Sequence, residues 1–331
     1  MKVFVAGDYY SGTGPALVTA EYIEHMGKAA MCQRFKNKAL RALELVIKVP
    51  FSSVILCSGH SKQNILAMKL GKLFGKKSAF LMHGCVEHEN RINHREDSGM
   101  NRTERETMRL ADMIIAVSEY FAGWLKENYP EYADKTGAVP NGIGLRAGKS
   151  PVLKDRDGNM ILAVGGGMPR KRIVNVCRAL AELRREEEYK DLYLTVIGDE
   201  GDDTALINGF DFVENKGIVS HEEAKRLMEK ASLFVQNSCF ETFGMAPLEA
   251  LSHGCDLLIS KETGAIGIFE GIDDRFIIND CENTDEIREK IRFMQNCHNN
   301  EILISSLNRE NVSWESRTKE LLQKLYSLKN D

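Results

Sequence analysis

The sequence predicts an α/β protein made of two Rossmann-like, doubly wound domains. Residues 2–6 (KVFVA) and 160–164 (MILAV) are short apolar runs, and each leads through a glycine-rich turn into a helical pattern. A strand, a glycine-rich turn and a helix, in this order, open a doubly wound sheet. The chain has 331 residues, which is enough for two cores of ordinary size.

Further apolar runs of strand length alternate with helical patterns, as a parallel sheet covered on both faces requires. They span residues 53–57, 78–82, 113–117, 192–197, 233–236 and 256–260. Between residues 139 and 150 (VPNGIGLRAGKS), proline, asparagine and three glycines interrupt regular structure. We therefore expect a first domain over residues 1–146 and a second over 147–312, followed by a last helix near residues 314–328.

Composition argues against several classes of protein. No run of about 18 apolar residues is present, so the sequence predicts no membrane span. The apolar run at the N-terminus stops at Asp8, too early for a signal peptide. The eight cysteines are scattered without a CxxC pair, which indicates reduced thiols in a cytoplasmic protein rather than disulfides or a zinc site.

Charge is distributed unevenly along the chain. Residues 1–150 hold 21 lysines and arginines against 15 acidic residues, whereas the remainder holds 23 against 33. A basic first half suits an anionic partner such as a phospholipid surface or a phosphorylated acceptor, although ordinary scatter also explains the counts. We expect no nucleic-acid partner.

Residues 35–49 (FKNKALRALELVIKV) form a basic amphipathic stretch, and residues 69–77 (KLGKLFGKK) add positive charge nearby. Such a stretch can attach to anionic lipid. It can equally form a helix that packs against the core and exposes a basic face to solvent. The sequence leaves both interpretations open.

Two glycine clusters are candidates for phosphate binding. Residues 11–14 (SGTG) and 165–167 (GGG) each precede a helix, whose N-terminal amides and dipole favour anions. Neither has the spacing of a dinucleotide fingerprint or a P-loop, so a plain tight turn is an equal alternative. The second cluster continues into Arg170, Lys171 and Arg172, cations that could neutralise a departing diphosphate.

The most informative segment is residues 237–254 (NSCFETFGMAPLEALSHG), which follows an apolar strand and turns helical near Met245. Glu241 lies in the loop before the helix, and Glu249 lies about one turn inside it. The N–H groups of residues 243–245 would point at an anion at the helix N-terminus. Glu249 could then accept hydrogen bonds from two ribose hydroxyls, and Glu241 could face a sugar.

The spacing Glu241-x7-Glu249 resembles the E-x7-E motif of retaining glycosyltransferases of family four. That family has the GT-B fold, in which two Rossmann-like domains face a central cleft. Other similar segments extend over nearly the whole chain: HG at 83–84, AD at 111–112, VPNGI at 139–143, GGGMPRK at 165–171, LTVIG at 194–198, KGIV at 216–219 and SWE at 313–315. The last resembles the start of the family's closing helix, which implies that residues 313–331 cross back to the first domain.

The resemblance implies that Glu241, Lys171 and His83 are the catalytic residues. Lys171 would stabilise the diphosphate leaving group, and His83 would contact the donor sugar near its anomeric centre. No carboxylate is well placed as a nucleophile in such enzymes. Glu241 is therefore expected to position the sugar and to act through its charge rather than as a base.

The resemblance also implies a set of donor-binding residues. Glu249 would bind the ribose, Ile218 would hold the base through main-chain contacts, and the other members would surround the sugar and its phosphates. The full set is Gly14, Gly166, Arg170, Lys171, Ile218, Phe243, Gly244, Met245 and Glu249.

The sequence departs from the family at three positions. Gly166 stands where the family has an arginine, so Arg170 or Arg172 would have to supply that phosphate contact. Gly144 replaces an aspartate after PNGI. Asp256 replaces a common proline, a change that we expect to affect only the start of a strand.

The implied activity is transfer of a sugar from a nucleotide-diphosphate sugar, with UDP as the commonest carrier in the family. The acceptor would be a glycan, a lipid-linked or another hydroxyl compound in cell-surface polysaccharide or glycoconjugate synthesis. No cofactor and no metal are expected. The protein would be cytoplasmic, with peripheral contact between its basic first domain and the inner membrane face as an option. The alternative is a catalytically silent subunit that binds the nucleotide sugar beside an active transferase.

Two polar clusters could be interpreted as metal sites, but we expect both to be loops instead. Residues 199–203 (DEGDD) follow a strand of the second domain, where we expect a solvated loop. His83, His88 and His94 lack the spacing of a metalloprotease site. Residues 86–106 are polar, and we expect a mobile acceptor-side loop there.

Overall fold

The computed structural model describes residues 1–35, 37–144 and 156–330. The chain divides into two compact units, which we call unit 1 and unit 2. Unit 1 comprises Met1–His88, Glu96–Gly144 and Arg309–Asp331, and unit 2 comprises Glu89–Arg95 and Leu145–Asn308. The predicted domain boundary at residues 146–147 lies outside the described residues.

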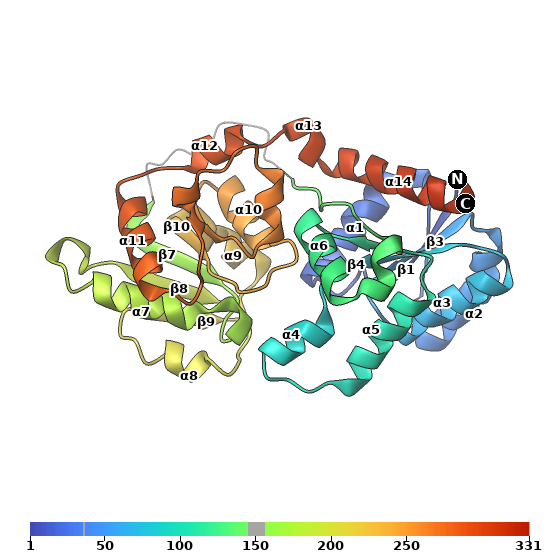
Figure 1. The fold of residues 1–331 in the computed structure, drawn as a ribbon, viewed down its shortest axis with the longest axis horizontal. Coiled ribbons are helices and arrows are strands. Elements are labelled where there is room, and N and C mark those ends of the chain that lie inside the picture. Colours follow the sequence, from blue (N-terminus) through green and yellow to red (C-terminus); the bar gives the residue numbers. More distant parts are fainter. Residues whose placement is uncertain (36, 145–155, 331) are drawn as a thin grey trace. The chain divides into compact units, whose positions relative to one another are not determined.

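Unit 1 is built on a six-stranded parallel sheet with the strand order β2-β1-β3-β4-β5-β6 (Figure 1). The strands are β1 (Val3–Ala6), β2 (Ala30–Cys32), β3 (Val54–Ser58), β4 (Ser78–Met82), β5 (Met113–Ala116) and β6 (Thr136–Ala138). Strands β1, β3 and β4 are buried along their whole length. Burial on both faces explains why they are continuous apolar runs in the sequence.

Helices surround this sheet, and several begin at a side chain that caps their free amides. Asn37, Ser61 and Ser118 each accept hydrogen bonds from the first turn of the helix that follows them. The helices of the N-terminal half are α1 (Gly14–Met26), α2 (Lys38–Lys48), α3 (Lys62–Leu73), α4 (Val86–Ile92), α5 (Ser98–Leu110) and α6 (Glu119–Asn128).

The loop predicted over residues 86–106 is wrong, because α4 and α5 occupy most of this segment. The buried carboxylate of Glu104 accepts hydrogen bonds from the N–H groups of Val86 (2.9 Å) and Glu87 (3.2 Å), at the start of α4. Asp97 caps α5 in the same way. These carboxylates accept hydrogen bonds from the first N–H groups of the two helices. In the sequence, they resemble the polar residues of a solvated loop.

The C-terminal helices α13 (Arg309–Val312) and α14 (Trp314–Asn330) belong to unit 1. The Trp314 ring packs edge-on against Tyr22 of α1, with the ring centroids 5.3 Å apart. The N–H of Ile143 donates to the Val312 carbonyl at 2.9 Å. The end of the chain is thereby fixed to the first helix of the unit.

Unit 2 contains a second parallel sheet with the order β12-β11-β10-β7-β8-β9. Its strands are β7 (Asp157–Val164), β8 (Tyr193–Ile197), β9 (Val213–Gly217), β10 (Ala231–Gln236), β11 (Asp256–Ser260) and β12 (Ile277–Ile278). Its helices are α7 (Ile173–Leu183), α8 (Thr204–Ile207), α9 (His221–Lys230), α10 (Met245–Ser252), α11 (Thr284–Gln295) and α12 (Asn300–Ser305). This strand order is that of the Rossmann fold, and it reverses between β7 and β10.

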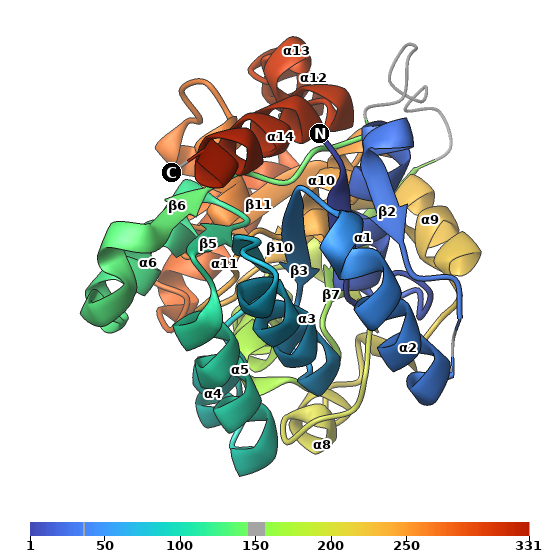
Figure 2. The ribbon, with the colours of Figure 1, turned by 90° about the vertical axis from the view of Figure 1, so that its right-hand side faces the viewer.

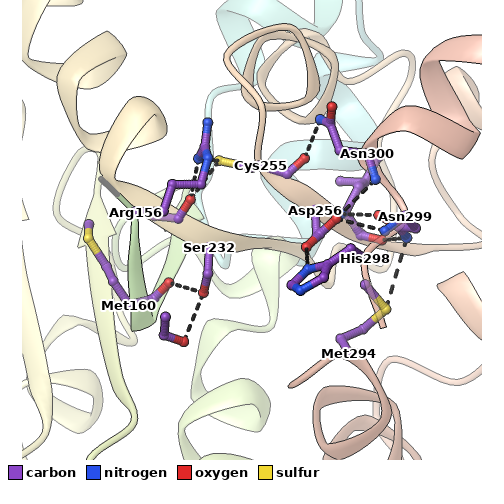
Figure 3. Close-up of polar contacts among 12 residues, drawn as sticks. Arg156, Met160, Ser232, Cys255, Asp256, Met294, His298, Asn299 and Asn300 are labelled. Carbon is purple, nitrogen blue, oxygen red and sulfur yellow. Dashed lines mark hydrogen bonds and ion pairs between the residues drawn. The ribbon is translucent and has the colours of Figure 1, made fainter. Parts of the chain in front are cut away.

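Asp256 does more than begin a strand, contrary to the expectation from the sequence. Its Oδ1 accepts the N–H groups of Asn299 (2.7 Å) and Asn300 (2.9 Å), and its Oδ2 lies 2.8 Å from His298 Nδ1 (Figure 3). The Asn299 side chain accepts the N–H of Leu257 in return, at 2.9 Å. Asp256 therefore ties β11 to the start of α12, a role that proline could not fill.

The structure can be compared with the expectations about membrane spans and cysteines. Among the described residues, no helix combines the length and the apolar character that crossing a membrane requires. All eight cysteines are free thiols. Four of them are buried, namely Cys57, Cys85, Cys177 and Cys255.

Gly142 offers a test of how α14 is seated. A Cβ added at Gly142 would lie 2.5 Å from Cδ2 and 2.7 Å from Cα of Trp314. Gly142→Ala should therefore lower the free energy of unfolding by about 1–3 kcal/mol, because the helix would have to shift. At Gly144 an added Cβ meets nothing within 4 Å. In urea unfolding Gly144→Ala should change stability by less than about 0.5 kcal/mol. Equal losses in the two variants would contradict this packing.

Candidate functional site

All predicted site residues of unit 2 except Ile218 follow the carboxyl ends of β7 and β10. These strands are neighbours in the sheet, at the point where the strand order reverses. Open α/β sheets bind ligands in the crevice beside such a switch point. The glycine-rich turn after β7 and the segment after β10 are thus brought together, although they are far apart in the sequence.

Glu241 is the centre of this arrangement. Its Oε2 forms an ion pair with Lys171 Nζ and accepts hydrogen bonds from Arg170 Nη1 and Gln236 Nε2, both at 3.2 Å. Its backbone is fixed as well, because its N–H donates to the Glu262 carbonyl at 2.9 Å. The carboxylate is therefore held in one place by side chains and backbone together.

The charges at this centre shift the ionisation of Glu241. Burial alone would raise the pKa of Glu241, but the positive charges of Lys171 and Arg170 outweigh burial and lower that pKa to about 2. Burial lowers the pKa of Lys171, while the Glu241 carboxylate opposes that shift. Because Glu241 is ionised at neutral pH and touches the ammonium, we treat Lys171 as a cation there.

Of the two arginines that could replace the family's missing cation, Arg170 is the one at the site. Besides Glu241 it faces Glu89, with Nε 3.7 Å from the carboxylate. Arg172 turns elsewhere, pairs with Glu282 and donates to the Pro169 carbonyl at 2.7 Å. The structure thus separates two candidates that the sequence left equal.

The glycine turn after β7 does not present free amides in this structure. The N–H groups of Gly165 and Gly166 donate to the Ile197 carbonyl at 2.8 and 3.0 Å, and that of Gly167 donates to the Asp199 carbonyl at 3.0 Å. The turn is a close contact between the ends of β7 and β8 rather than an open phosphate cradle. Gly166 as a donor-binding residue stays a prediction.

The same contact explains why position 166 holds glycine, where the family that the sequence resembles has an arginine. A Cβ at Gly166 would lie 1.9 Å from the Asp199 carbonyl oxygen, and its φ of +54° disfavours other residues. No side chain fits there without moving the backbone. The cation therefore has to come from another position.

The start of α10 provides the free donors that the glycine turn lacks. Within the described part of the chain, the N–H groups of Phe243, Gly244 and Met245 have no hydrogen-bond acceptor. Gly244 has a φ of +96°, which shapes the turn into the helix. Unsatisfied amides at the positive end of a helix dipole favour an anion.

Glu249 and Ile218 are also placed where a ligand could reach them. Glu249 lies one turn after Met245 on α10, and its side chain is expected to lean back toward the start of the helix. Its carboxylate has no partner among the described residues. Ile218 follows β9 and is 77% exposed, so its apolar surface is uncovered.

Gly14 and His83 belong to unit 1. Gly14 is the first residue of α1, and a Cβ there would meet nothing within 4 Å. His83 follows β4, with Nε2 2.7 Å from Ser58 Oγ. Removal from water lowers the pKa of His83 to about 4, so the ring is neutral at physiological pH.

Sequence reasoning missed two partners of the charged centre. Gln236 is the polar last residue of β10. Open α/β sheets bind ligands beside the carboxyl ends of their strands. The position of this glutamine could therefore have indicated its role from the sequence. Glu89 was hidden because it lies far from Arg170 in the sequence. Nothing in its own neighbourhood indicates that contact.

The polar clusters considered for metals form no obvious site. Among the described residues, no group of three or more histidine, cysteine, aspartate or glutamate side chains is arranged to hold a metal ion. Asp199 and Glu200 are exposed at the end of β8. His94 lies 3.2 Å from Asp202 through its Nδ1, in an exposed pair.

Comparison with known proteins finds one family model that is similar to the second half of the chain. Residues 148–303 match the model of the family described as glycosyl transferases group 1. This similarity supports a glycosyltransferase as the class of enzyme. No curated protein matches the sequence.

Solved structures resemble the chain over its whole length. HepE (Alr3699) of Anabaena, in a complex with UDP and glucose, is 14% identical with a TM-score of 0.72, and the match covers 99% of this chain and 100% of that one. Sucrose-phosphate synthase from Thermosynechococcus elongatus is 14% identical with a TM-score of 0.67, covering 99% of both chains. The lipopolysaccharide outer core galactosyltransferase WaaB is 17% identical with a TM-score of 0.64, also covering 99% of both. These likenesses, together with the two parallel sheets, show the GT-B fold.

The closed environment of Gly166 generates one prediction. Gly166→Ala, and Gly166→Arg with the family's residue, should each lower the free energy of unfolding by more than about 2 kcal/mol. Gly267→Ala is the control, because an added Cβ there meets nothing within 4 Å. Thermal unfolding measures both effects. A stabilised Gly166→Arg protein would contradict the contact with Asp199.

The ionised Glu241 generates a second prediction. Glu241→Gln leaves the buried Lys171 without an anion and leaves Arg170 with only Glu89, which should destabilise the fold by about 3–5 kcal/mol at pH 7. The pKa of Glu241 in the folded protein, about 2, lies below its ordinary value of 4.5. The stabilisation is therefore complete above about pH 4.5 and is lost as the pH falls toward 2. The difference in unfolding free energy between wild type and variant should shrink over that range.

Urea unfolding at pH 7 and at about pH 3.5 measures this difference. Glu282→Gln is the matched control, because Glu282 pairs with Arg172 at the surface. It should cost less than about 1 kcal/mol at either pH. A penalty for Glu241→Gln that does not depend on pH would show that its charge is not what stabilises the fold.

Proposed function

We propose that this protein is a retaining glycosyltransferase. It moves a sugar from a nucleotide-diphosphate sugar, with UDP as the carrier, to a hydroxyl group of a glycan or a lipid-linked acceptor. The observation that carries the proposal is the charged centre at the switch point of unit 2. There, Lys171 and Arg170 face Glu241 beside the unoccupied amides of α10.

The chemistry requires positive charge where the leaving group departs. When the bond between the anomeric carbon and the phosphate oxygen breaks, its electron pair stays on the diphosphate. Lys171, Arg170 and the amides of residues 243–245 are donors of the kind that stabilise such charge, and the protein holds them before the ligand arrives. This preorganisation supports transfer without a metal, so we propose that none is required.

Glu241 acts through position and charge in this proposal. A carboxylate with a pKa of about 2 and two cationic partners is a poor base and a weak nucleophile. We therefore propose that the acceptor hydroxyl attacks from the face that the diphosphate leaves. The acceptor proton then passes to the departing phosphate oxygen. Glu241 keeps Lys171 oriented and faces the sugar.

The remaining residues take the donor's other parts. The free carboxylate of Glu249 suits the two ribose hydroxyls, and the exposed Ile218 suits a base. From unit 1, the neutral His83 can donate or accept a hydrogen bond with the sugar, and Gly14 leaves room for a phosphate at the start of α1. Solved structures of HepE contain UDP or UDP-glucose, which supports UDP as the carrier.

The proposed setting is the synthesis of a cell-surface polysaccharide or glycoconjugate in the cytoplasm. The likeness to WaaB, whose substrate class is lipopolysaccharide, supports this setting. A silent donor-binding subunit is the second candidate. The absence of a side chain at Gly166 favours it, since the family has a cation there.

One experiment tests the proposal. The purified protein is mixed with UDP-, GDP- and ADP-sugars, and donor binding is followed by thermal shift while release of sugar is followed by NMR. We expect UDP-sugars to stabilise the protein and the sugar to be released as the same anomer. Lys171→Ala and Glu241→Ala should each lower turnover by about 100-fold or more.

Arg172→Asn is the matched control, because it removes the neighbouring cation that faces Glu282 instead. Asparagine tolerates the left-handed backbone at this position, where φ is +50°. This variant should keep most of the activity. Donor binding without release of sugar would favour the silent subunit. Inversion of the anomer, or near-normal turnover in both alanine variants, would refute the assignment.

A further inference from the structure

One surface of unit 1 exposes many large apolar side chains. Among the described residues, seventeen large apolar side chains are exposed, and nine of these lie between Phe35 and Phe74. They come from α2, from the short helix η2 (Val49–Phe51) that continues it, and from α3, or from residues next to these elements. We call this set the α2–α3 surface; it comprises Phe35, Leu40, Leu43, Val46, Ile47, Phe51, Leu66, Leu73 and Phe74.

The two helices that form this surface lie side by side. Residues of α2 contact residues of α3, and η2 contacts both helices (Figures 1 and 2). Isolated exposed apolar side chains are normal on a protein surface, but so many on neighbouring helices indicate an interaction site.

The outward direction of these side chains is set by how α2 packs. Leu45 and Val49 form a fully buried stripe against the core. A second stripe, of charged residues, is used inside the unit: Arg41 donates to the Gly7 carbonyl at 2.8 Å, and Lys48 donates to the Cys32 carbonyl at 2.8 Å. Glu44 accepts the N–H of Arg34.

The third stripe of α2 is apolar and faces outward. Leu43 and Ile47 are each 55% exposed, and Phe51 is 78% exposed. Of the two interpretations that the sequence left open, the packing against the core is seen at Leu45 and Val49. Arg41 and Lys48, however, are engaged within the unit rather than forming a solvated basic face. The apolar stripe is what α2 presents to its surroundings.

The charge around this surface is strongly one-sided. Between Gln33 and Lys77 the chain has ten lysines and arginines and a single acidic residue, Glu44. That glutamate is buried. Lys62, Lys69 and Lys72 of α3 are exposed, and Lys69 lies 3.7 Å from Glu106 of α5.

We propose that the α2–α3 surface docks on an anionic lipid bilayer. Its leucine, isoleucine and phenylalanine side chains enter the boundary between headgroups and acyl chains, while the lysines face the lipid phosphates. Apolar side chains beside lysines are the composition that binds anionic membranes.

The charge favours a membrane over the other occupants. A second copy of the chain would bring two basic surfaces together and repel itself, because a two-fold interface uses the same patch twice. Protein interfaces are also depleted of lysine. A nucleic acid would use the lysines but would leave the aliphatic side chains in water. The proposal is independent of the donor site, since all of these residues belong to unit 1.

Sedimentation with vesicles tests the proposal. The full chain is mixed with vesicles of phosphatidylglycerol and phosphatidylcholine, or of phosphatidylcholine alone, and the bound fraction is measured. We expect binding only to the anionic vesicles, and release in about 0.5 M salt. Leu43→Ser/Ile47→Ser should weaken binding by more than about tenfold, because the substituted side chains no longer insert. Lys72→Glu/Lys76→Glu should also weaken binding to the anionic vesicles, because it replaces two positive charges with negative ones.

Two matched variants separate this surface from general stickiness. Leu206→Ser/Ile302→Ser removes side chains that are 55% and 56% exposed, but in unit 2. Lys319→Glu/Lys329→Glu makes the same charge change on α14 of unit 1. Both should bind vesicles like the wild type, and all four variants should keep the thermal shift with UDP if the proposed function holds.

Three outcomes would overturn the proposal. Wild-type protein that stays in solution with anionic vesicles would do so, as would equal binding by Leu43→Ser/Ile47→Ser. A dimer seen by light scattering without lipid, and lost in Leu43→Ser/Ile47→Ser, would assign the surface to a second copy instead. Failure of donor binding alone would affect the proposed function and would leave this proposal intact.

Discussion

The site of unit 2 depends on one buried carboxylate that two cations share. Glu241 follows β10, whereas Lys171 and Arg170 follow β7, so their contact joins the two segments at the switch point of the sheet. A backbone bond reinforces it, because the N–H of Cys239 donates to the Arg170 carbonyl at 3.0 Å. Without Glu241, Lys171 would be a buried, unpaired charge, and Arg170 would keep only Glu89 at 3.7 Å. The arrangement therefore holds together only as a group.

This constraint also gives the site its chemical character. With Glu241 ionised, Lys171 and Arg170 are held at its carboxylate. In the proposed function, an arriving diphosphate would find these donors already in place and would not have to reorganise them, which is where electrostatic catalysis gains most. The glycine turn does not offer its N–H groups to a ligand as a phosphate loop does, because they donate to carbonyls at the end of β8. Gly166 and Gly198 allow the ends of β7 and β8 to touch, with a Cβ at Gly198 only 2.6 Å from the Gly166 nitrogen.

The two units use charge in different ways. Unit 2 concentrates opposite charges in a small buried group, where they position one another. Unit 1 exposes like charges on α3, in a part of the unit where α2 and α3 also expose apolar side chains. Like charges at a surface repel a second copy of the same surface and attract an anionic one over about a Debye length. The first pattern suits chemistry on a small ligand, and the second suits attachment to an extended surface.

Much of the fold was within reach of the sequence. Strands β4 and β11 begin and end where the patterns predict, because doubly buried strands are continuous apolar runs. The short edge strands β2, β6 and β12 were missed, since two or three residues carry no period. The edge strand β9 (VENKG) was missed as well, because it has a single large apolar residue. The polar segment of α4 and α5 was mistaken for a loop, because its capping carboxylates look like solvated residues.

The site divides in the same way. The sequence by itself determined the residue types: two glutamates at a fixed spacing, a run of cations after a glycine turn, and a helix start between the glutamates. Only the tertiary structure decided that Arg170 rather than Arg172 faces Glu241, that the amides of the glycine turn are already used, and that α2 turns an apolar stripe outward. Local patterns record the period and polarity of a segment. The partner of each side chain depends on which distant segment packs against it.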